Sequence, residues 1–216
     1  MTYAELVQKI RDYTEVDSNV LTSTIVDGFI QDAEWRIQRE VDQDNSRRYA
    51  TASAISSQKY LNVPTDALII RGVQITDGGS GDNTRAYLEY RDMTFISEYN
   101  PTGSTGEPKY YGNWDEDTII VAPIPDDTYT FQINYILKPE QLSASNTETY
   151  LSKYFPNGLL YACLVEAYGF LKGPQDLAQL YEQKYQTAAK GFSIEQMGRR
   201  RRDEYQSGVP RIQTQG

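Results

Sequence analysis

The stretch 156-PNGLLYACLVEAYGFL-171 has the apolar spacing of an α-helix that packs in a core. Its apolar side chains recur at intervals of three and four residues, as at Leu160, Leu164 and Ala167. Pro156 suits the first turn of a helix, because a backbone N–H is not needed there. Gly173-Pro174 then ends this helix and begins another. The sequence therefore predicts two consecutive helices in this part of the chain.

The second of these helices has the same apolar spacing. Its apolar side chains are Leu177, Leu180, Tyr181, Tyr185, Ala188 and Phe192. Nothing before Gly208-Val209-Pro210 forces it to stop, so we expect it to continue to about Arg202. Because both helices are amphipathic, each needs a partner for its apolar face.

A second pair of helices is predicted at the N-terminus. Thr2 and Glu5 form a capping box, the sequence pattern that typically starts a helix. The apolar face of the first helix carries Tyr3, Leu6, Val7, Ile10 and Tyr13. After a break at residues 17–19, the second carries Val26, Phe29, Ile30, Ala33, Ile37 and Val41. Trp35 lies off this stripe, so we expect it to meet another layer of the chain or a neighbouring molecule.

The middle of the chain, from about Arg47 to Pro139, has the spacing of β-strands. Side chains alternate between apolar and polar over residues 131–137, and residues 68–75 and 118–122 are β-branched runs. Turn signals separate them, at residues 56–57, 77–83, 101–106 and 126–127. About six short strands result. Residues 91–99 are expected to form a short helix between strands.

The predicted fold class is α+β, with a four-helix bundle built from both termini and a small antiparallel β domain, a sandwich or a barrel, inserted in it. The expected boundaries are 1–45 and 150–200 for the bundle, 46–149 for the β domain and 201–216 for an extended C-terminal arm. Bringing the two distant halves together costs only a slowly growing loop entropy. Three independent pieces would instead leave apolar helix faces exposed.

Composition restricts the functions that are open to the chain. Its 216 residues carry a formal net charge of −9, with 18 tyrosines, one cysteine and no histidine. The missing histidine removes the commonest general base and metal ligand. No apolar run approaches the roughly 18 residues that span a bilayer, and no signal peptide is recognised. We therefore expect a soluble protein that is made in the cytosol.

Candidate chemical sites each have a simpler interpretation. Asp115-Glu116-Asp117, with Asp126 and Asp127, is a carboxylate cluster without the spacing of a calcium loop, and aspartate is favoured in tight turns. Cys163 lies among leucines and is interpreted as core packing. The glycine-rich residues 78–81 lack the lysine of a phosphate-binding loop. The expectation is no enzyme activity, no metal and no cofactor.

The last nineteen residues, 198–216, reverse the charge of the chain. They hold five arginines against two acids, so they carry +3 and the rest carries −12. Such a basic, apolar-poor segment is either an arm that orders on a partner, nucleic acid or protein, or a solvated chain end, and the charge reversal favours the arm. The acidic body and the nearby apolar anchors favour protein. The predicted docking residues are Arg199, Arg200, Arg201, Arg202, Tyr205, Val209, Arg211 and Ile212.

Eight segments match a pattern known from other proteins, namely 2–6, 108–111, 123–126, 135–139, 159–168, 172–174, 180–185 and 198–205. Through them the chain resembles, over nearly its whole length, the head–tail adaptor (connector) proteins of tailed bacteriophages. It implies a structural virion protein at the head–tail junction, made in the host cytoplasm. Such a protein would form a ring, expected to be a dodecamer, between the portal and the tail tube or nozzle.

The resemblance also implies that residues 198–216 dock on the portal and that genome DNA passes through the ring during ejection, without sequence-specific binding. A membrane partner is not expected. An alternative is another tail-completion or nozzle component of the virion. A third interpretation is a carbohydrate-binding β module in which Tyr110, Tyr111 and Trp114 stack on sugars; ordinary cross-strand packing explains the same aromatics.

Overall fold

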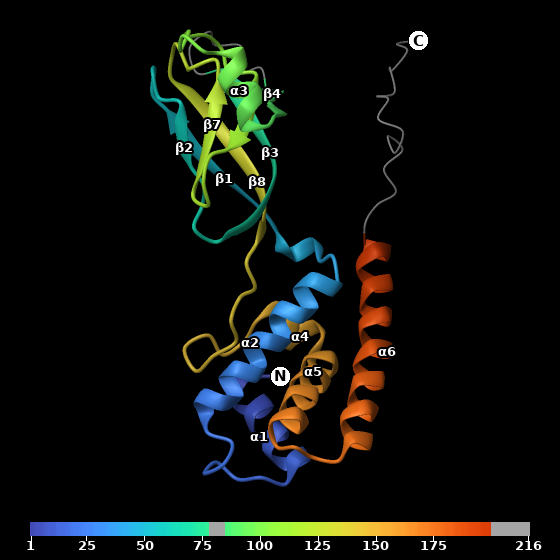
Figure 1. Ribbon diagram of the computed structural model, residues 1–216. Helices are drawn as coiled ribbons and strands as arrows, with labels where there is room; N and C mark the ends of the chain where they lie inside the picture. Colours follow the sequence, from blue (N-terminus) through green and yellow to red (C-terminus); the bar gives the residue numbers. More distant parts are fainter. Residues whose placement is uncertain (78–84, 200–216) are drawn as a thin grey trace, which may run out of the picture. The chain divides into compact units, whose positions relative to one another are not determined.

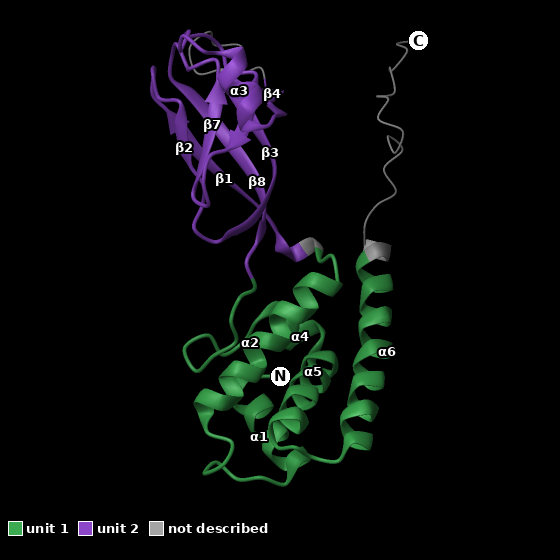
Figure 2. Ribbon diagram, viewed as in Figure 1, with its two compact units in different colours: residues 1–44, 139–216 green, residues 45–138 purple. Residues whose placement is uncertain are grey.

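The computed structural model describes residues 1–77 and 85–199 (Figure 1). The fold is α+β, as the sequence predicts, and the chain divides into two compact units (Figure 2). One unit is built from residues 1–44 and from the chain that starts at residue 139, and the other from residues 45–138. We call them the helical unit and the β unit.

The helical unit is centred on one helix, α5 (Pro156–Phe170). Three other helices, α1 (Tyr3–Thr14), α2 (Ser23–Glu40) and α6 (Gln175–Arg199), each pack against it. Figure 1 shows α5 in orange between the blue N-terminal helices and the red α6. The two ends of the chain therefore share one core, while a regular four-helix bundle stays a prediction.

Helix α5 carries apolar side chains around most of its surface, with Asn157 and Glu166 as the exceptions, which is typical of a helix packed among others. Leu159, Cys163, Leu164 and Ala167 are fully buried, and Pro156 occupies the first turn as predicted. Small side chains at positions 162, 163 and 167 let neighbouring helices approach closely. The interpretation of Cys163 as a core residue is confirmed: the side chain is fully buried in the apolar cluster of this unit, and its Sγ lies 3.8 Å from the backbone carbonyl of Phe29.

Both N-terminal helices begin as the sequence indicates. The Thr2 hydroxyl accepts from the Glu5 N–H at 3.3 Å and the Glu5 carboxylate accepts from the Thr2 N–H at 2.8 Å, so the capping box is confirmed. Thr22 caps α2. Trp35 lies half-buried on α2, with the guanidinium of Arg39 5.4 Å from the centre of its ring.

One helix was not predicted. Helix α4 (Tyr150–Tyr154) is capped by Thr149, whose hydroxyl accepts from the Ser152 N–H, and the Ser152 hydroxyl accepts in turn from the Thr149 N–H. Its five residues are too few for a helical apolar period to be recognised. The predicted short helix at 91–99 is present in the β unit as α3 (Met93–Tyr99).

The β unit consists of two four-stranded sheets. Sheet 1 has the order β1-β8-β3-β4, with the strands Arg47–Ala54, Tyr129–Leu137, Ala67–Asp77 and Arg85–Tyr87. Sheet 2 has the order β2-β7-β6-β5, with the strands Tyr60–Asn62, Thr118–Ala122, Tyr110–Asn113 and Glu89–Tyr90. The two sheets are separate, so the barrel alternative is wrong.

The expectation of a purely antiparallel domain is also wrong in one place. Strand β5 pairs with β6 in parallel, Glu89 beside Tyr110 and Tyr90 beside Tyr111. Parallel neighbours need a crossover connection, and here α3 and the following loop supply it. This pairing is only two residues long, so the sequence shows no alternation of apolar and polar residues from which it could be predicted.

The core of the β unit lies between the two sheets. In β8, Tyr129, Phe131, Ile133 and Tyr135 are buried and the residues between them are more exposed, as the alternation predicts. Leu61, Ile119 and Val121 of sheet 2 join the same cluster. The opposite face of sheet 1 is therefore left outside this core.

Candidate interaction surfaces

The predicted docking segment begins where the described chain stops. Arg199 is the final residue of α6. The other predicted docking residues, Arg200, Arg201, Arg202, Tyr205, Val209, Arg211 and Ile212, lie outside the described residues. What the structure shows is how α6, the helix that leads to this segment, is held in the helical unit.

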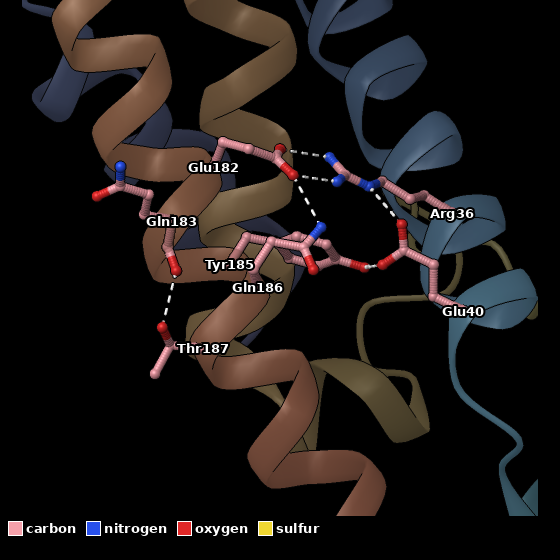
Figure 3. A network of polar contacts seen from close by, with 7 residues as sticks. All are labelled: Arg36, Glu40, Glu182, Gln183, Tyr185, Gln186 and Thr187. Atoms are coloured by element: carbon pink, nitrogen blue, oxygen red, sulfur yellow. Dashed lines mark hydrogen bonds and ion pairs between the residues drawn. The ribbon is translucent and has the colours of Figure 1, made fainter.

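Polar contacts fasten α6 to α2 (Figure 3). The guanidinium of Arg36 on α2 donates two hydrogen bonds to the carboxylate of Glu182 on α6, at 2.9 and 2.6 Å, and a third to Glu40 at 3.0 Å. The hydroxyl of Tyr185 donates to the other oxygen of Glu40, and the amide of Gln186 donates to Glu182 at 2.8 Å. Charge-assisted paired bonds of this kind are among the stronger polar contacts in proteins.

The electrostatics of this network agree with its geometry. The hydrogen bonds from Arg36 lower the pKa of Glu182, and the bonds to Glu182 raise the pKa of Arg36. Burial raises the pKa of Tyr185, and its bond to Glu40 raises it further. The Arg36 guanidinium also lies 4.2 Å from the centre of the Tyr185 ring. Near neutral pH Arg36 therefore stays protonated, Glu182 ionised and the Tyr185 hydroxyl neutral, and these contacts clamp the two helices together.

Aromatic rings hold the remaining length of α6. Tyr181 stacks on Tyr168 of α5 with ring centres 5.4 Å apart, and Phe192 stacks on Phe155 at 4.4 Å. Two apolar residues of α6 point the other way: Leu180, which the sequence placed on the apolar stripe, is exposed, and Ile194 is 70% exposed. Of these two, Ile194 lies about one turn before the predicted docking segment, so the helix keeps some apolar surface near it.

A buried carboxyl group lies in the same unit. Glu34 on α2 is 1% exposed, and both of its oxygens accept from the backbone N–H of Leu142, each at 3.2 Å. Burial raises the pKa of Glu34 to about 8, against the opposing effect of its hydrogen bonds. The residue was not predicted, although its place between Ile30 and Ile37 at helical spacing put it on the buried stripe of α2.

The outer face of sheet 1 is rich in arginine and tyrosine, and we call it the arginine face. Tyr49 of β1 and Tyr87 of β4 are 69% and 70% exposed, and between them run Asn134 of β8 and Gly72 of β3. Because Gly72 has no side chain, the ring of Tyr87 lies over its backbone, 3.9 Å from where a Cβ would stand. A hollow of about 400 Å³ opens here, and Arg47, Arg48 and Arg71 also line it.

Local features of the strands explain the positions of Arg48, Arg71 and Arg85. The pairing of β3 with β8 shifts register between Ile70 and Gly72, so Arg71 is the extra residue of a bulge and stands clear of the ladder. Arg48 donates to the backbone carbonyls of Asn45 and Arg47. Arg85, on the edge strand β4, faces Thr76. Sequence reasoning missed this surface, because its residues come from separate strands and only the register brings them together.

The aspartate-rich segments form turns in which aspartate side chains accept hydrogen bonds from nearby backbone N–H groups. In the tip between β6 and β7, Asp115 accepts from the Asp117 N–H at 3.0 Å, and in the next turn Asp127 accepts from the Thr128 N–H at 2.7 Å. Within residues 1–77 and 85–199, no three histidine, cysteine, aspartate or glutamate side chains gather into a metal site. In the same part of the chain, no helix is long and apolar enough to cross a membrane.

The aromatics of the carbohydrate interpretation do not share one platform. Tyr111 is buried and meets Tyr90 edge-on, while Tyr110 packs against Phe95 and Tyr99 of α3. Trp114 is 51% exposed and leans on Tyr60, with ring centres 5.1 Å apart. Cross-strand and helix–sheet packing therefore accounts for two of the three side chains.

Comparison with known proteins adds one finding. A family model described as SU10 adaptor protein matches residues 1–212, and so spans both units and most of the segment that follows α6. A search of curated proteins found no significant match.

Proposed function

Because this chain belongs to the SU10 adaptor protein family, we propose that it is a phage structural protein that joins the portal at the capsid vertex to the tail. The observation that carries the proposal is the family match, which covers both units rather than one of them. The protein would be a virion component at the head–tail junction. Its role is assembly, and the proposal assigns it no catalytic residue and no cofactor.

In this proposal many copies of the chain form a ring beneath the portal, with twelve as the expected number. The tail tube or nozzle binds the opposite side of the ring, and genome DNA leaves through its channel. Outside residues 198–216 the chain carries a net charge of −12. A channel wall of that sign would let DNA slide past without sticking, since like charges repel.

Docking on the portal is assigned to residues 198–216. The basic charge of this segment and its apolar anchors suit a protein surface. The described structure supports this assignment at one point, since α6 is clamped at Arg36 and Glu182 and so provides a rigid base for the segment that follows it. Another tail-completion or nozzle role remains the alternative function.

The test is to mix the protein with its candidate portal and to measure the mass and symmetry of the product by native mass spectrometry and electron microscopy. We expect a complex that contains a closed ring of this chain on the portal. Binding to a tail component with no affinity for the portal would replace the proposal by the nozzle alternative. An image labelled at the β unit would then show which side of the particle it occupies.

A further inference from the structure

On the outer face of sheet 1, two arginines have no partner among the described residues. Arg71 and Arg85 make no hydrogen bond or ion pair with any residue in the described ranges, and the face between Tyr49 and Tyr87 carries no carboxylate. A guanidinium that stays unpaired beside exposed aromatic rings contributes little to stability. Arginine and tyrosine are also the residue types most enriched where proteins bind one another.

The same unit carries a surface of complementary chemistry on its other sheet. The tip between β6 and β7 presents Trp114, Asp115, Glu116 and Asp117, and all four side chains are exposed. The tip is rigid, because the backbone N–H groups of Trp114 and Asp115 both donate to the carbonyl of Thr118, at 3.0 and 3.2 Å. None of its three carboxylates forms an ion pair within the described part of the chain.

We propose that the acidic tip at residues 114–117 of one copy binds the arginine face of sheet 1 in the next copy. The inference rests on the proposed function, because it supplies the contact between neighbouring copies of the ring. The tip and the face line separate hollows of the β unit, so a copy that uses its tip on one neighbour keeps its face for another. Contacts of this head-to-tail kind repeat, and they close into a ring when the rotation between copies allows it.

The chemistry of the two surfaces matches group for group. Carboxylates at positions 115–117 accept paired hydrogen bonds from guanidiniums, for which arginine geometry is well suited. The indole of Trp114 offers a flat ring to Tyr49, Tyr87 or an arginine, the pairing that dominates many interfaces. The hollow of about 400 Å³ receives such a tip. The charged groups at its edge would make the contact sensitive to salt.

Nucleic acid is the competing occupant of the arginine face, because arginines and exposed aromatic rings also bind phosphates and bases. The charge of the whole unit argues against it. Residues 45–138 hold eight lysines and arginines against twelve aspartates and glutamates, so a polyanion longer than the face meets a net negative unit. A carboxylate tip is short enough to reach the arginines alone.

The most direct test of this contact is a disulfide cross-link between two copies. We would mix the full chain carrying Arg71→Cys with the full chain carrying Glu116→Cys, oxidise mildly, and read dimers on a non-reducing gel, both free at high concentration and with portal present. The native Cys163 is buried and stays silent. Glu98→Cys, at an exposed site on α3, replaces Glu116→Cys in the control. We expect cross-linking of the first pair only; equal or absent cross-linking in both samples overturns the proposal.

A charge exchange tests the same contact without new cysteines. Arg71→Glu and Glu116→Arg are each expected to weaken self-association about tenfold or more, and the double variant is expected to recover part of the loss. Single variants that assemble like the native chain contradict the proposal. Oligonucleotide binding is measured in parallel by fluorescence anisotropy. If Arg71→Glu loses oligonucleotide binding while its assembly is unchanged, the proposal is contradicted and the face is assigned to nucleic acid.

These outcomes are separate from those of the proposed function. Portal binding is assigned to residues 198–216, which neither variant alters, so a variant that binds portal but forms no ring removes only the contact proposed here. If the native chain does not bind portal, the proposed function fails, and the cross-link between free copies still decides whether the tip meets the face.

Discussion

In the helical unit Arg36 is enclosed by two carboxylates and a tyrosine ring, whereas in the β unit Arg71 stands on a bulge with no acid beside it. Both units have a closed apolar core, so the difference lies in what the polar groups do. In the helical unit they hold helices from the two ends of the chain together. On sheet 1 of the β unit, Arg71 and Arg85 are left on the surface without a partner in the described ranges. Charge therefore stabilises one unit and is available for partners in the other.

The largest expected effect is on the stability of the helical unit, and measuring it tests whether the two units unfold separately. Leu164→Ala removes a fully buried side chain from α5 and should lower the free energy of unfolding of the helical unit by about 3–5 kcal/mol. Each unit holds one tryptophan, Trp35 or Trp114, so single-tryptophan variants report the units one at a time in a urea titration. Only the Trp35 transition should move; equal shifts in both would mean that the chain unfolds as one body.

The next effect concerns the buried Glu34. The group ionises near pH 4.5 when unfolded and near pH 8 when folded, so the folded state holds an extra proton between these values. Each rise in pH across this range therefore lowers the free energy of unfolding. Glu34→Gln should remove that slope, because the amide does not ionise. One pKa unit corresponds to about 1.4 kcal/mol, but the amide keeps only part of the carboxyl's hydrogen bonds, so the variant should be more stable than the native protein by roughly 2–3 kcal/mol at pH 9.

Thermal melts at pH 5, 7 and 9 measure this slope. Glu182→Gln is the matched control, because Arg36 lowers the pKa of Glu182. The stabilisation from a carboxylate of that kind is present above its unfolded pKa and is lost as the pH falls. Between pH 5 and pH 9 Glu182→Gln should therefore leave the slope of the pH profile unchanged, whereas Glu34→Gln removes it. A slope that persists in Glu34→Gln would show that Glu34 is not its source.

A smaller effect compares the two arginines directly. Arg36→Ala leaves Glu182 without its paired donor at a half-buried site and should cost about 1–2 kcal/mol. Arg71→Ala removes an exposed and unpaired side chain and should change the free energy of unfolding by less than about 0.5 kcal/mol. Urea titrations of both variants check the contrast. A similar cost at both sites would show that the arginine face is structural.

The smallest effect on stability is expected from deleting residues 198–216. The segment adds little apolar surface to a core, so the melting temperature should stay within the error of the measurement. Portal binding, measured by co-sedimentation, should be lost at the same time. A large fall in the melting temperature would make the segment part of the helical unit. Portal binding that persists would move the docking site elsewhere.

The fold could be predicted from the sequence where a period runs long enough to be seen. The capping box at Thr2, the helix that begins at Pro156 and the alternation in β8 all depend on residues close together in the chain. Helix α4 and the parallel pair β5–β6 could not be predicted, because five and two residues show no period. The order of strands within each sheet depends on contacts between distant segments.

The candidate surfaces divide in the same way. The arginine run at residues 199–202 is visible as a local charge anomaly, and its role as a docking segment stays a prediction. The arginine face could not be predicted, because the bulge at Arg71 and the pairing of β3 with β4 decide which side chains lie together. Glu34 could have been found, since a carboxylate at an apolar position of a helix indicates a buried charge.

One feature of the β unit bears on its history. Strands β1 and β8 are hydrogen-bonded neighbours, with Arg47 beside Ile136, so the chain enters and leaves the unit at one place. A gene that gained, lost or exchanged the segment for residues 45–138 would leave two ends that a short peptide can rejoin. Recombination can therefore replace this module while the helical part is inherited unchanged, and the surfaces of the β unit can diversify faster than the helical scaffold that carries it.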